Sequence, residues 1–245
     1  MAYIEAQGYD RLQITPDAEQ PKPMTRMRQT IADRLTRSFT TTPHFFTTVS
    51  VDMTGLAAYR AQLKEQGSAY TITDFLVKAA ASALKEIPIV NSTTDGKSVW
   101  SHGRVHVGLA VALDEGLVVV VIRDVDELSM SGLHKRATEL SAKAHAGKLT
   151  PDEMTGSTFT LSNMGMLDVE NFTAIINPGE SAILAVSSIV KSPAVIDDAL
   201  VIRSVMKMTL SADHRLIDGA TAAKFINGIK RRLQDTAWWK GLLQS

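Results

Sequence analysis

The chain has 245 residues, enough for one large domain or two small ones, and its 44% hydrophobic and 21% charged residues are ordinary for a globular protein. Its 26 basic residues balance 26 acidic ones, which disfavours attraction to nucleic acid or to an anionic membrane. There is no cysteine, which excludes disulfides, thiol nucleophiles and thiolate metal sites and fits a reducing compartment.

The sequence also carries no sign of a membrane span or a secretory signal. The longest aliphatic run, Leu117–Ile122, is far shorter than the ~20 residues that cross a bilayer. Met1–Asp10 has no basic region followed by an apolar core. We therefore expect a soluble, intracellular protein with no nucleic-acid or membrane partner.

The first half of the chain predicts an arm followed by helices and one strand. Residues 1–23 end in TPDAEQPKP, whose prolines oppose regular structure, so they are expected to form an arm or linker. Apolar residues at helical spacing predict a helix over roughly 24–40, and alternation predicts a strand over 44–53. Thr54 and Thr73 are candidate N-caps of the next two helices.

The second half predicts a hairpin, further strands and two helices. VHVGLAVAL (105–113) alternates and meets GLVVVVIR (116–123) across Asp114-Glu115. A helix over about 129–146, strands near 158–162, 182–190 and 199–212, a hairpin turn at IDDA (196–199) and a helix over 218–233 complete the set. Antiparallel strands with interspersed helices indicate an α+β fold, with helices packed on a mixed sheet.

Among the six histidines, His214 is the strongest candidate for chemistry. It ends an apolar strand and precedes a helix, where a side chain can be presented rigidly to a cleft. Asp218 follows four residues later, near a helix N-terminus that favours negative charge. Taken alone, this stretch is explained at least as well by a charged turn without a chemical role.

The other histidines give weaker signals. His102 and His106 lie four apart on the polar face of a strand, without an H-E-x-x-H motif, so no metal site is expected. His134 and His145 fall on a polar helix and are expected at the surface, while a structural role is expected for His44.

Four segments, in order from about residue 23 to 234, resemble one family. LSADHRLIDGATAAKFI resembles the H-x-x-x-D-G signature of the dihydrolipoamide acyltransferases, the core components of 2-oxoacid dehydrogenase complexes. GKLTPDEMTGSTFTLSNMGMLDVENFTAIINPGESAILAV is similar to a second hallmark segment of that family. PMTRMRQTIADRLTRSFTTTPHF and GLAVALDEGLVVVVIRDVDELS are similar to its entry segment and its central hairpin.

The resemblance implies a fold and a reaction. The fold is the α/β sandwich of chloramphenicol acetyltransferase, which has a mixed sheet with packed helices and forms trimers, here over a catalytic domain at 24–245. The reaction moves an acyl group, acetyl by similarity to the pyruvate branch, between coenzyme A and a dihydrolipoyl group. Carried over by motif, His214 is the general base, Asp218 its structural support, and Ser162 the hydroxyl that faces the transition state from the neighbouring subunit.

Further residues are assigned by the same resemblance. Arg60 falls at the phosphate side of coenzyme A, with a solvated helix arginine as the alternative. Asp218 is expected to pair with Arg28, or with Arg34, rather than to relay protons. Trp238 and Trp239 near the chain end are expected to act as a hook that joins trimers into a larger core.

The resemblance also implies partners and a location. No DKA lipoylation motif occurs, so the lipoyl group is expected on another chain or on a missing part of a longer protein. Lipoyl domains, a decarboxylase and a dihydrolipoamide dehydrogenase are the expected partners, in the bacterial cytoplasm or the mitochondrial matrix. Three alternatives stay open: another acyl group (succinyl or branched-chain), a small-molecule O-acetyltransferase of the same fold, and a catalytically silent structural core.

Overall fold

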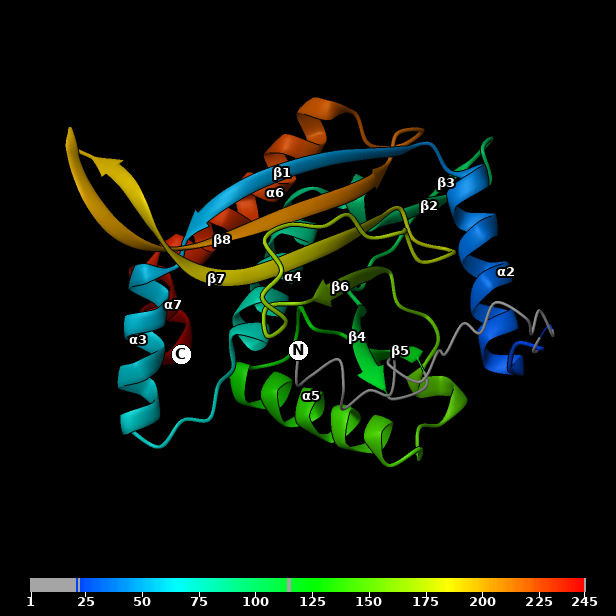
Figure 1. Ribbon diagram of the computed structural model, residues 1–245, viewed down its shortest axis with the longest axis horizontal. Helices are drawn as coiled ribbons and strands as arrows, with labels where there is room; N and C mark the ends of the chain where they lie inside the picture. The colour runs from blue at the N-terminus through cyan, green and yellow to red at the C-terminus, as the bar shows by residue number, and fades with distance from the viewer. Residues whose placement is uncertain (1–20, 22, 114–115, 245) are drawn as a thin grey trace, which may run out of the picture.

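A six-stranded mixed sheet forms the centre of the protein in the computed structural model, which describes residues 21, 23–113 and 116–244 (Figure 1). The strand order is β1-β8-β7-β6-β4-β5. β6 runs parallel to both β4 and β7, and the remaining neighbours are antiparallel. The strands are β1 (His44–Asp52), β4 (Val107–Leu113), β5 (Gly116–Ile122), β6 (Phe159–Asn163), β7 (Ala182–Ile196) and β8 (Ala199–Asp213). A separate ribbon pairs β2 (Ser92–Thr94) with β3 (Val99–Ser101).

Helices cover one face of the sheet and both of its ends. α4 (Ile72–Glu86), α5 (Met130–His145) and α6 (Gly219–Gln234) pack behind the strands. α3 (Thr54–Glu65) and α7 (Thr236–Gln244) lie at one end, and α2 (Arg26–Thr41) stands at the other (Figure 1). Short 3₁₀ turns occupy η2 (Pro88–Asn91) and η3 (Pro151–Glu153). Inward-facing strand residues such as Leu161, Leu184 and Leu210 meet these helices in one hydrophobic core.

An irregular segment, residues 164–181, crosses the opposite face of the sheet. Asn171 Oδ1 accepts a hydrogen bond from Thr209 Oγ1 at 2.7 Å, and Thr209 faces away from the helix layer because its neighbour Leu210 lies in the core. The Ile176 N–H donates to His44 Nε2 at 3.1 Å. Polar side chains of the sheet therefore hold this segment in place.

The mixed sheet with packed helices confirms the fold predicted from the sequence, with differences at two helix starts. Thr71, rather than Thr73, caps α4: its hydroxyl accepts from the Asp74 N–H while the Asp74 carboxylate accepts from the Thr71 N–H. α3 begins without a side-chain cap, and the hydroxyl of Thr54 instead accepts from the Ser204 N–H of β8 at 2.9 Å. The 105–123 hairpin is confirmed by its strand pairing, whereas its Asp114-Glu115 turn and the 1–20 part of the predicted arm lie outside the described residues.

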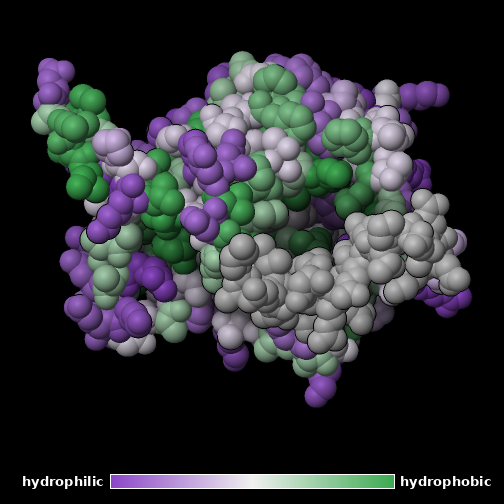
Figure 2. Space-filling model, in the orientation of Figure 1, coloured by the Kyte–Doolittle hydropathy of each residue, from purple (hydrophilic) through white to green (hydrophobic). Residues whose placement is uncertain are grey.

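Beyond the partners β1 and β6, strands β7 and β8 continue together as a two-stranded ribbon that projects from the molecule (Figure 1). Asp197 and Asp198 both adopt positive φ at its tip, which fits a tight hairpin turn and confirms the turn predicted at IDDA. Val195, Leu200 and Ile202 are 69%, 77% and 75% exposed, and Figure 2 shows a green cluster on the projecting arm below its purple tip. This ribbon thus presents apolar side chains that no other described residue covers.

The C-terminal tail folds back as α7, so the prediction that Trp239 forms an intertrimer hook is wrong, whereas the part predicted for Trp238 stays a prediction. Trp239 is fully buried, with its ring 4.8 Å from the Phe75 ring and 4.5 Å from the Trp238 ring. Trp238 is half-buried beneath the Arg232 guanidinium, whose central carbon lies 5.8 Å from the ring centre. The large apolar area of the Trp239 side chain is already buried in its own subunit, so it is not available for contact with another trimer.

Trp239→Ala is expected to lower the free energy of unfolding by about 3–5 kcal/mol, because it removes a fully buried aromatic side chain and leaves a cavity beside Phe75. Urea unfolding followed by circular dichroism measures this loss. Trp238→Ala, at a half-buried position next to it, is the matched control and should cost clearly less. Equal stability of the Trp239 variant and the wild type would contradict the packing described above.

Candidate active site

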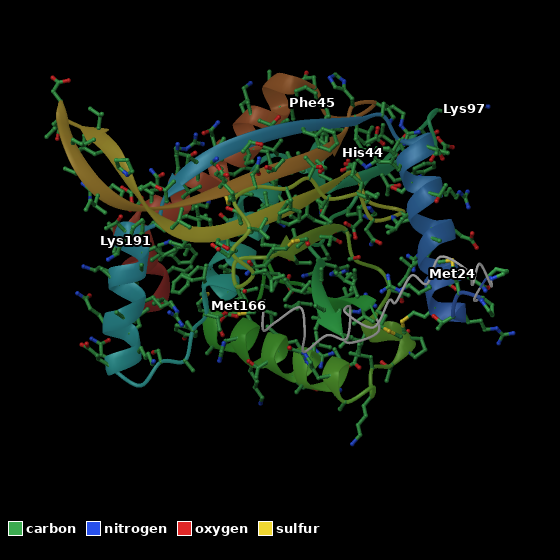
Figure 3. The ribbon with its side chains drawn as sticks, in the orientation of Figure 1. Met24, His44, Phe45, Lys97, Met166 and Lys191 are labelled. Carbon is green, nitrogen blue, oxygen red and sulfur yellow. The ribbon has the colours of Figure 1, made fainter. Side chains whose placement is uncertain are left out.

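His214 stands directly after β8, at the end of the sheet where β1 begins. The two strands end together because His44 pairs with Asp213. The His214 N–H donates to the carbonyl of Pro43 at 2.9 Å, and its exposed ring meets the ring of Phe45 edge-on at 4.9 Å. Figure 3 labels Phe45 and His44 at this start of β1. Neither ring nitrogen of His214 has a hydrogen-bond partner among the described residues, so both are available to a ligand.

One ion pair, between the two residues that flank His214, fixes the turn that carries it. Asp213 is 2% exposed, and its carboxylate accepts from Arg215 Nε at 2.9 Å and Nη2 at 2.6 Å. The same carboxylate accepts from the Arg215 N–H at 3.0 Å. These hydrogen bonds raise the pKa of Arg215 above its usual range. A two-pronged ion pair of this geometry holds the backbone of the intervening histidine.

Asp218 is the N-cap of α6. Its Oδ1 accepts from the Thr221 N–H at 2.7 Å, and this backbone hydrogen bond lowers the pKa of the carboxyl. The expected ion pair with Arg28 or Arg34 is absent from the described residues. Both arginines instead line a cavity of about 630 Å³ between α2 and the β4–β5 hairpin. Asp218 therefore shapes the site by starting α6 just after the histidine turn.

Ser162 lies near the carboxyl end of β6 and is 8% exposed. Its neighbour Leu161 points into the core, so Ser162 points to the opposite face, and its hydroxyl has no hydrogen-bond partner in the described part of the chain. Asn163 anchors the turn that follows: its amide donates to Thr73 Oγ1 at 3.1 Å and its Oδ1 accepts from the Gly165 N–H at 2.8 Å. A Cβ on Gly165 would lie 2.9 Å from that same Oδ1, so a larger residue there would have to displace the Asn163 amide.

Within one chain the structure does not bring Ser162 and His214 together. Ser162 pairs with Ala185, which pairs in turn with Thr209, five residues before His214. At about 3.3 Å per residue along a strand and about 4.8 Å between strands, the two residues lie on the order of 20 Å apart. The two side chains of one copy of the chain therefore cannot contact the same substrate atom.

Arg60 is half-buried on α3, where its Nε donates to the Tyr70 carbonyl at 2.8 Å. This hydrogen bond ties α3 to the segment that precedes α4. No ion pair of Arg60 occurs among the described residues. Its guanidinium thus has both a structural contact and N–H groups that a ligand can reach.

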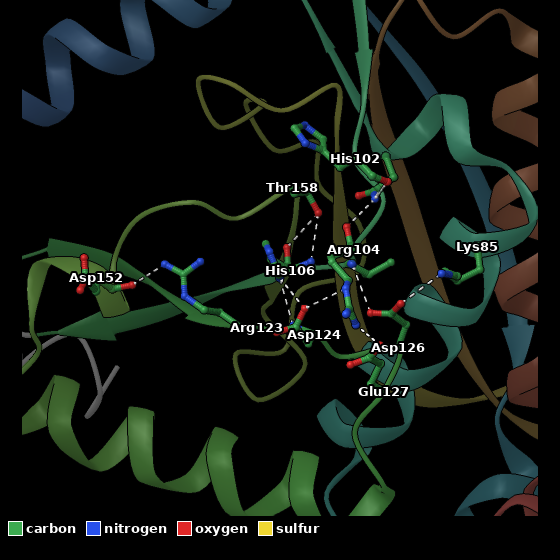
Figure 4. A network of polar contacts seen from close by, with 12 residues as sticks. Lys85, His102, Arg104, His106, Arg123, Asp124, Asp126, Glu127, Asp152 and Thr158 are labelled. Atoms are coloured by element: carbon green, nitrogen blue, oxygen red, sulfur yellow. Dashed lines mark hydrogen bonds and ion pairs between the residues drawn. The ribbon is translucent and has the colours of Figure 1, made fainter.

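His44 lies beside this region at the start of β1, whereas the other histidines make their contacts elsewhere. His106 and His102 belong to a polar network around Asp124 and Asp126, in which His106 Nδ1 accepts from the Asp124 N–H at 3.0 Å (Figure 4). No group of three histidine, aspartate or glutamate side chains among the described residues is placed to hold a metal ion. His134 differs from its expected surface position, because its Nδ1 lies 2.8 Å from the buried carboxylate of Asp74.

Sequence reasoning missed three of these contacts: the Asp213–Arg215 pair, the Phe45 ring against His214, and the Asp74–His134 pair. A signal existed for the first. Asp213 ends a strand in which apolar and polar residues alternate (VMKMTLSA), and an ionised side chain next to a buried strand needs a paired partner. The other two contacts join residues more than fifty positions apart, and a single sequence contains no indication of them.

The sheet and helices have the chloramphenicol acetyltransferase fold. A solved chloramphenicol acetyltransferase covers 82% of this chain with a TM-score of 0.56 at 14% identity, which supports the fold alone. The family model "2-oxoacid dehydrogenases acyltransferase (catalytic domain)" matches residues 16–239. The chain belongs to this family.

Individual relatives support this family assignment. The pyruvate dehydrogenase complex acetyltransferase component of Zymomonas mobilis is 40% identical over 86% of this chain. The branched-chain lipoamide acyltransferase component of Bacillus subtilis is 38% identical over 86%. This chain spans 49% and 51% of those two proteins, about half of their length. No helix in the described residues has the length and apolar character needed to cross a membrane.

A solved structure from Azotobacter vinelandii is the most informative relative for the site. This dihydrolipoamide acetyltransferase matches with a TM-score of 0.84 at 37% identity, over 91% of this chain and 95% of its own. A serine, a histidine and an asparagine were investigated there for their role in the catalytic mechanism. In its numbering the serine precedes the histidine by 52 positions, and the asparagine follows the histidine by four.

Proposed function

We propose that the chain is the catalytic domain, over residues 24–245, of a dihydrolipoamide acetyltransferase that passes an acetyl group between a dihydrolipoyl thiol and coenzyme A. One observation carries the assignment of residues: Ser162 precedes His214 by 52 positions and Asp218 follows it by four, the same spacing as in the Azotobacter vinelandii enzyme. Aspartate replaces asparagine at the last position. Both are good helix N-caps, and Asp218 has that role here.

His214 is proposed as the general base. A thiol is a weak nucleophile until it is deprotonated, and imidazole titrates close to neutral pH. Free ring nitrogens on a turn held by Asp213 and Arg215 suit the removal of the proton from one thiol and its return to the departing sulfur. Ser162 Oγ then donates a hydrogen bond to the oxyanion of the tetrahedral intermediate. No covalent acyl-enzyme is needed, because each thiol can attack the other's thioester directly.

We propose a homotrimer in which each active site joins His214 of one subunit to Ser162 of the next. Their separation within one chain, on the order of 20 Å by strand register, supports this arrangement. Exposed apolar side chains on α2 (Met27, Phe39) and on the β7–β8 ribbon (Leu200, Ile202) offer surface for such contacts. Holding both thiols at one subunit boundary replaces a bimolecular encounter by a positioned one.

Partners and location are proposed by analogy with the relatives. The solved structures include the cubic core of the pyruvate dehydrogenase multienzyme complex, and we propose that trimers build such a core through contacts that do not involve Trp239. Lipoyl domains, the decarboxylase and dihydrolipoamide dehydrogenase are the proposed partners, in the bacterial cytoplasm or the mitochondrial matrix. Arg60 is proposed to bind a phosphate of coenzyme A with the guanidinium N–H groups that Tyr70 leaves free.

With free dihydrolipoamide as acceptor, kcat/KM is expected to be highest for acetyl-CoA and lower for succinyl-CoA and isobutyryl-CoA. The assay measures transfer as the release of the coenzyme A thiol. Small alcohols offered in place of dihydrolipoamide should give no product, which separates this activity from a hydroxyl acetyltransferase. A preference for succinyl-CoA or isobutyryl-CoA would assign another acyl group, and absence of any transfer would leave a structural core.

A further inference from the structure

Glu180 is a buried glutamate that the proposed mechanism does not use. It lies two residues before β7 and is 7% exposed. Its Oε1 accepts hydrogen bonds from Ser157 Oγ at 2.5 Å, Thr160 Oγ1 at 2.8 Å and Asn177 Nδ2 at 2.7 Å. Its Oε2 is buried without a hydrogen-bond partner in the described part of the chain. The Glu180 carboxyl group thus links Thr160 on β6 to Ser157, which precedes β6, and to Asn177, which precedes β7.

The surroundings of this carboxyl are neutral. All three of its partners are uncharged, and no cation bonds to it among the described residues. Arg28 and Arg34 of α2 line the cavity that Asn177 also lines, and neither contacts Glu180. His106, whose backbone N–H donates to Thr158 Oγ1, directs its ring to Asp124. Burial raises the pKa of Glu180 to about 7, although the three hydrogen bonds act in the opposite direction.

Thr160 connects this carboxyl to the active-site serine. Thr160 and Ser162 are two residues apart on one short strand and therefore lie on the same face. Thr160 pairs with Gly108 of β4, where an added Cβ would lie 2.8 Å from Thr160 Oγ1 and 2.7 Å from Val119 Cγ1. The threonine side chain is thus enclosed between β4 and Glu180, and a shift of either would displace β6.

We propose that Glu180, in its neutral form, is a positioning residue that holds β6, and with it Ser162, through the hydroxyl of Thr160. The inference rests on the proposed function, since it gives Ser162 a task that depends on its position. Ionisation of Glu180 leaves Oε2 with a buried charge and no partner. Hydrating that charge requires β6 or the segment around Asn177 to move. Acyl transfer should therefore weaken as Glu180 loses its proton.

The first test compares kcat at saturating substrates across pH for the wild type and Glu180→Gln, which keeps a neutral side chain of the same shape. The ratio of the variant's kcat to that of the wild type is expected to rise about tenfold from pH 6 to pH 8, as the neutral fraction of the wild-type carboxyl falls. Thiol ionisation and His214 affect both proteins equally and cancel in the ratio. A constant ratio would overturn the proposal.

Glu153 provides a matched control, since it is another buried glutamate with hydrogen-bonded partners. Lys143 Nζ donates to Glu153 Oε1 at 2.9 Å, and this hydrogen bond, with others, lowers the pKa of Glu153 to about 2. Glu153→Gln should therefore leave the shape of the pH profile unchanged. If it altered the profile as Glu180→Gln does, the effect would reflect the loss of any buried carboxylate, and the assignment to Glu180 would be wrong.

A double-mutant cycle tests whether Glu180 acts through the serine. Glu180→Ala is expected to lower kcat in the wild type with little change in KM, and to have almost no further effect in a Ser162→Ala background. Equal losses in both backgrounds would contradict the route through Ser162. Should Glu180→Ala fail to fold, Glu180→Gln at pH 8 takes its place in the cycle, where it should raise kcat only if Ser162 is present.

Two readouts do not depend on activity. An infrared difference spectrum, wild type minus Glu180→Gln, should contain the carbonyl band of a protonated carboxyl at pH 6 and lose it by pH 8. Hydrogen exchange over residues 157–163 should be faster in Glu180→Ala than in Glu180→Gln. If the wild type transferred no acyl group, the proposed function would fail. These two measurements would still decide whether neutral Glu180 holds β6, and absence of the band would refute it.

Discussion

His214→Ala is expected to lower kcat for acyl transfer by about 10²–10⁴-fold, the usual contribution of a positioned general base. The loss should appear in kcat and in kcat/KM alike, because the missing proton transfer affects the transition state rather than substrate binding. Steady-state release of the coenzyme A thiol from acetyl-CoA and dihydrolipoamide measures it.

Folding should survive this change. The turn at His214 is held by its backbone N–H to Pro43 and by the Asp213–Arg215 ion pair, none of which involves the imidazole. The ring makes one edge contact with Phe45 and is otherwise exposed. His145→Ala, at an exposed position on α5, is the matched control and should keep wild-type kcat. Retention of full activity in the His214 variant would remove the histidine from the mechanism.

The core elements of the fold could be predicted from the sequence because their burial follows a simple period. The helices of the packed layer carry apolar stripes, and the central strands alternate or are apolar throughout. The long β7–β8 ribbon was underestimated. Pro193 argues against a strand interior, yet it pairs with Ile202 in a ribbon that has only two strands among the described residues, and such edge strands tolerate proline. α7 was missed because its burial depends on contact with Phe75, far away in sequence.

The candidate site was predictable only as separate residues. His214, Asp218 and Ser162 stand out through motifs, and the N-terminal position of Asp218 on α6 follows from local sequence alone. The proposed partners of Asp218 were wrong because a single sequence gives no distances between distant arginines and a helix cap. The clamp from Asp213 to Arg215 and the burial of Glu180 depend on tertiary packing in the same way.

Ser162→Ala is expected to lower kcat by about 10²–10³-fold with little change in KM, the usual cost of losing one donor to a developing oxyanion. The substitution removes one oxygen from a side chain without hydrogen-bond partners in the described residues, so stability should hardly change. Ser187→Ala on β7 offers a contrast, because its hydroxyl bonds the backbone of Lys207 at 2.9 Å. That variant should lose stability more than kcat. A Ser162 variant with wild-type kcat would show that the hydroxyl has no part in the reaction.

Mixing the two inactive variants tests the shared site directly. In a trimer with His214 and Ser162 on different subunits, a site is complete when a Ser162→Ala chain supplies the histidine and a His214→Ala chain supplies the serine. Equal amounts, unfolded together and refolded, should recover about a quarter of wild-type activity, because random assembly makes one boundary in four complete. The strand register allows no such recovery within one chain, since it separates the two residues by two strands and five positions. If the mixture stayed as inactive as its components, the site would not be formed between subunits. Recovery in co-refolded but not in separately refolded and then mixed samples would further show that subunits do not exchange once the trimer has formed.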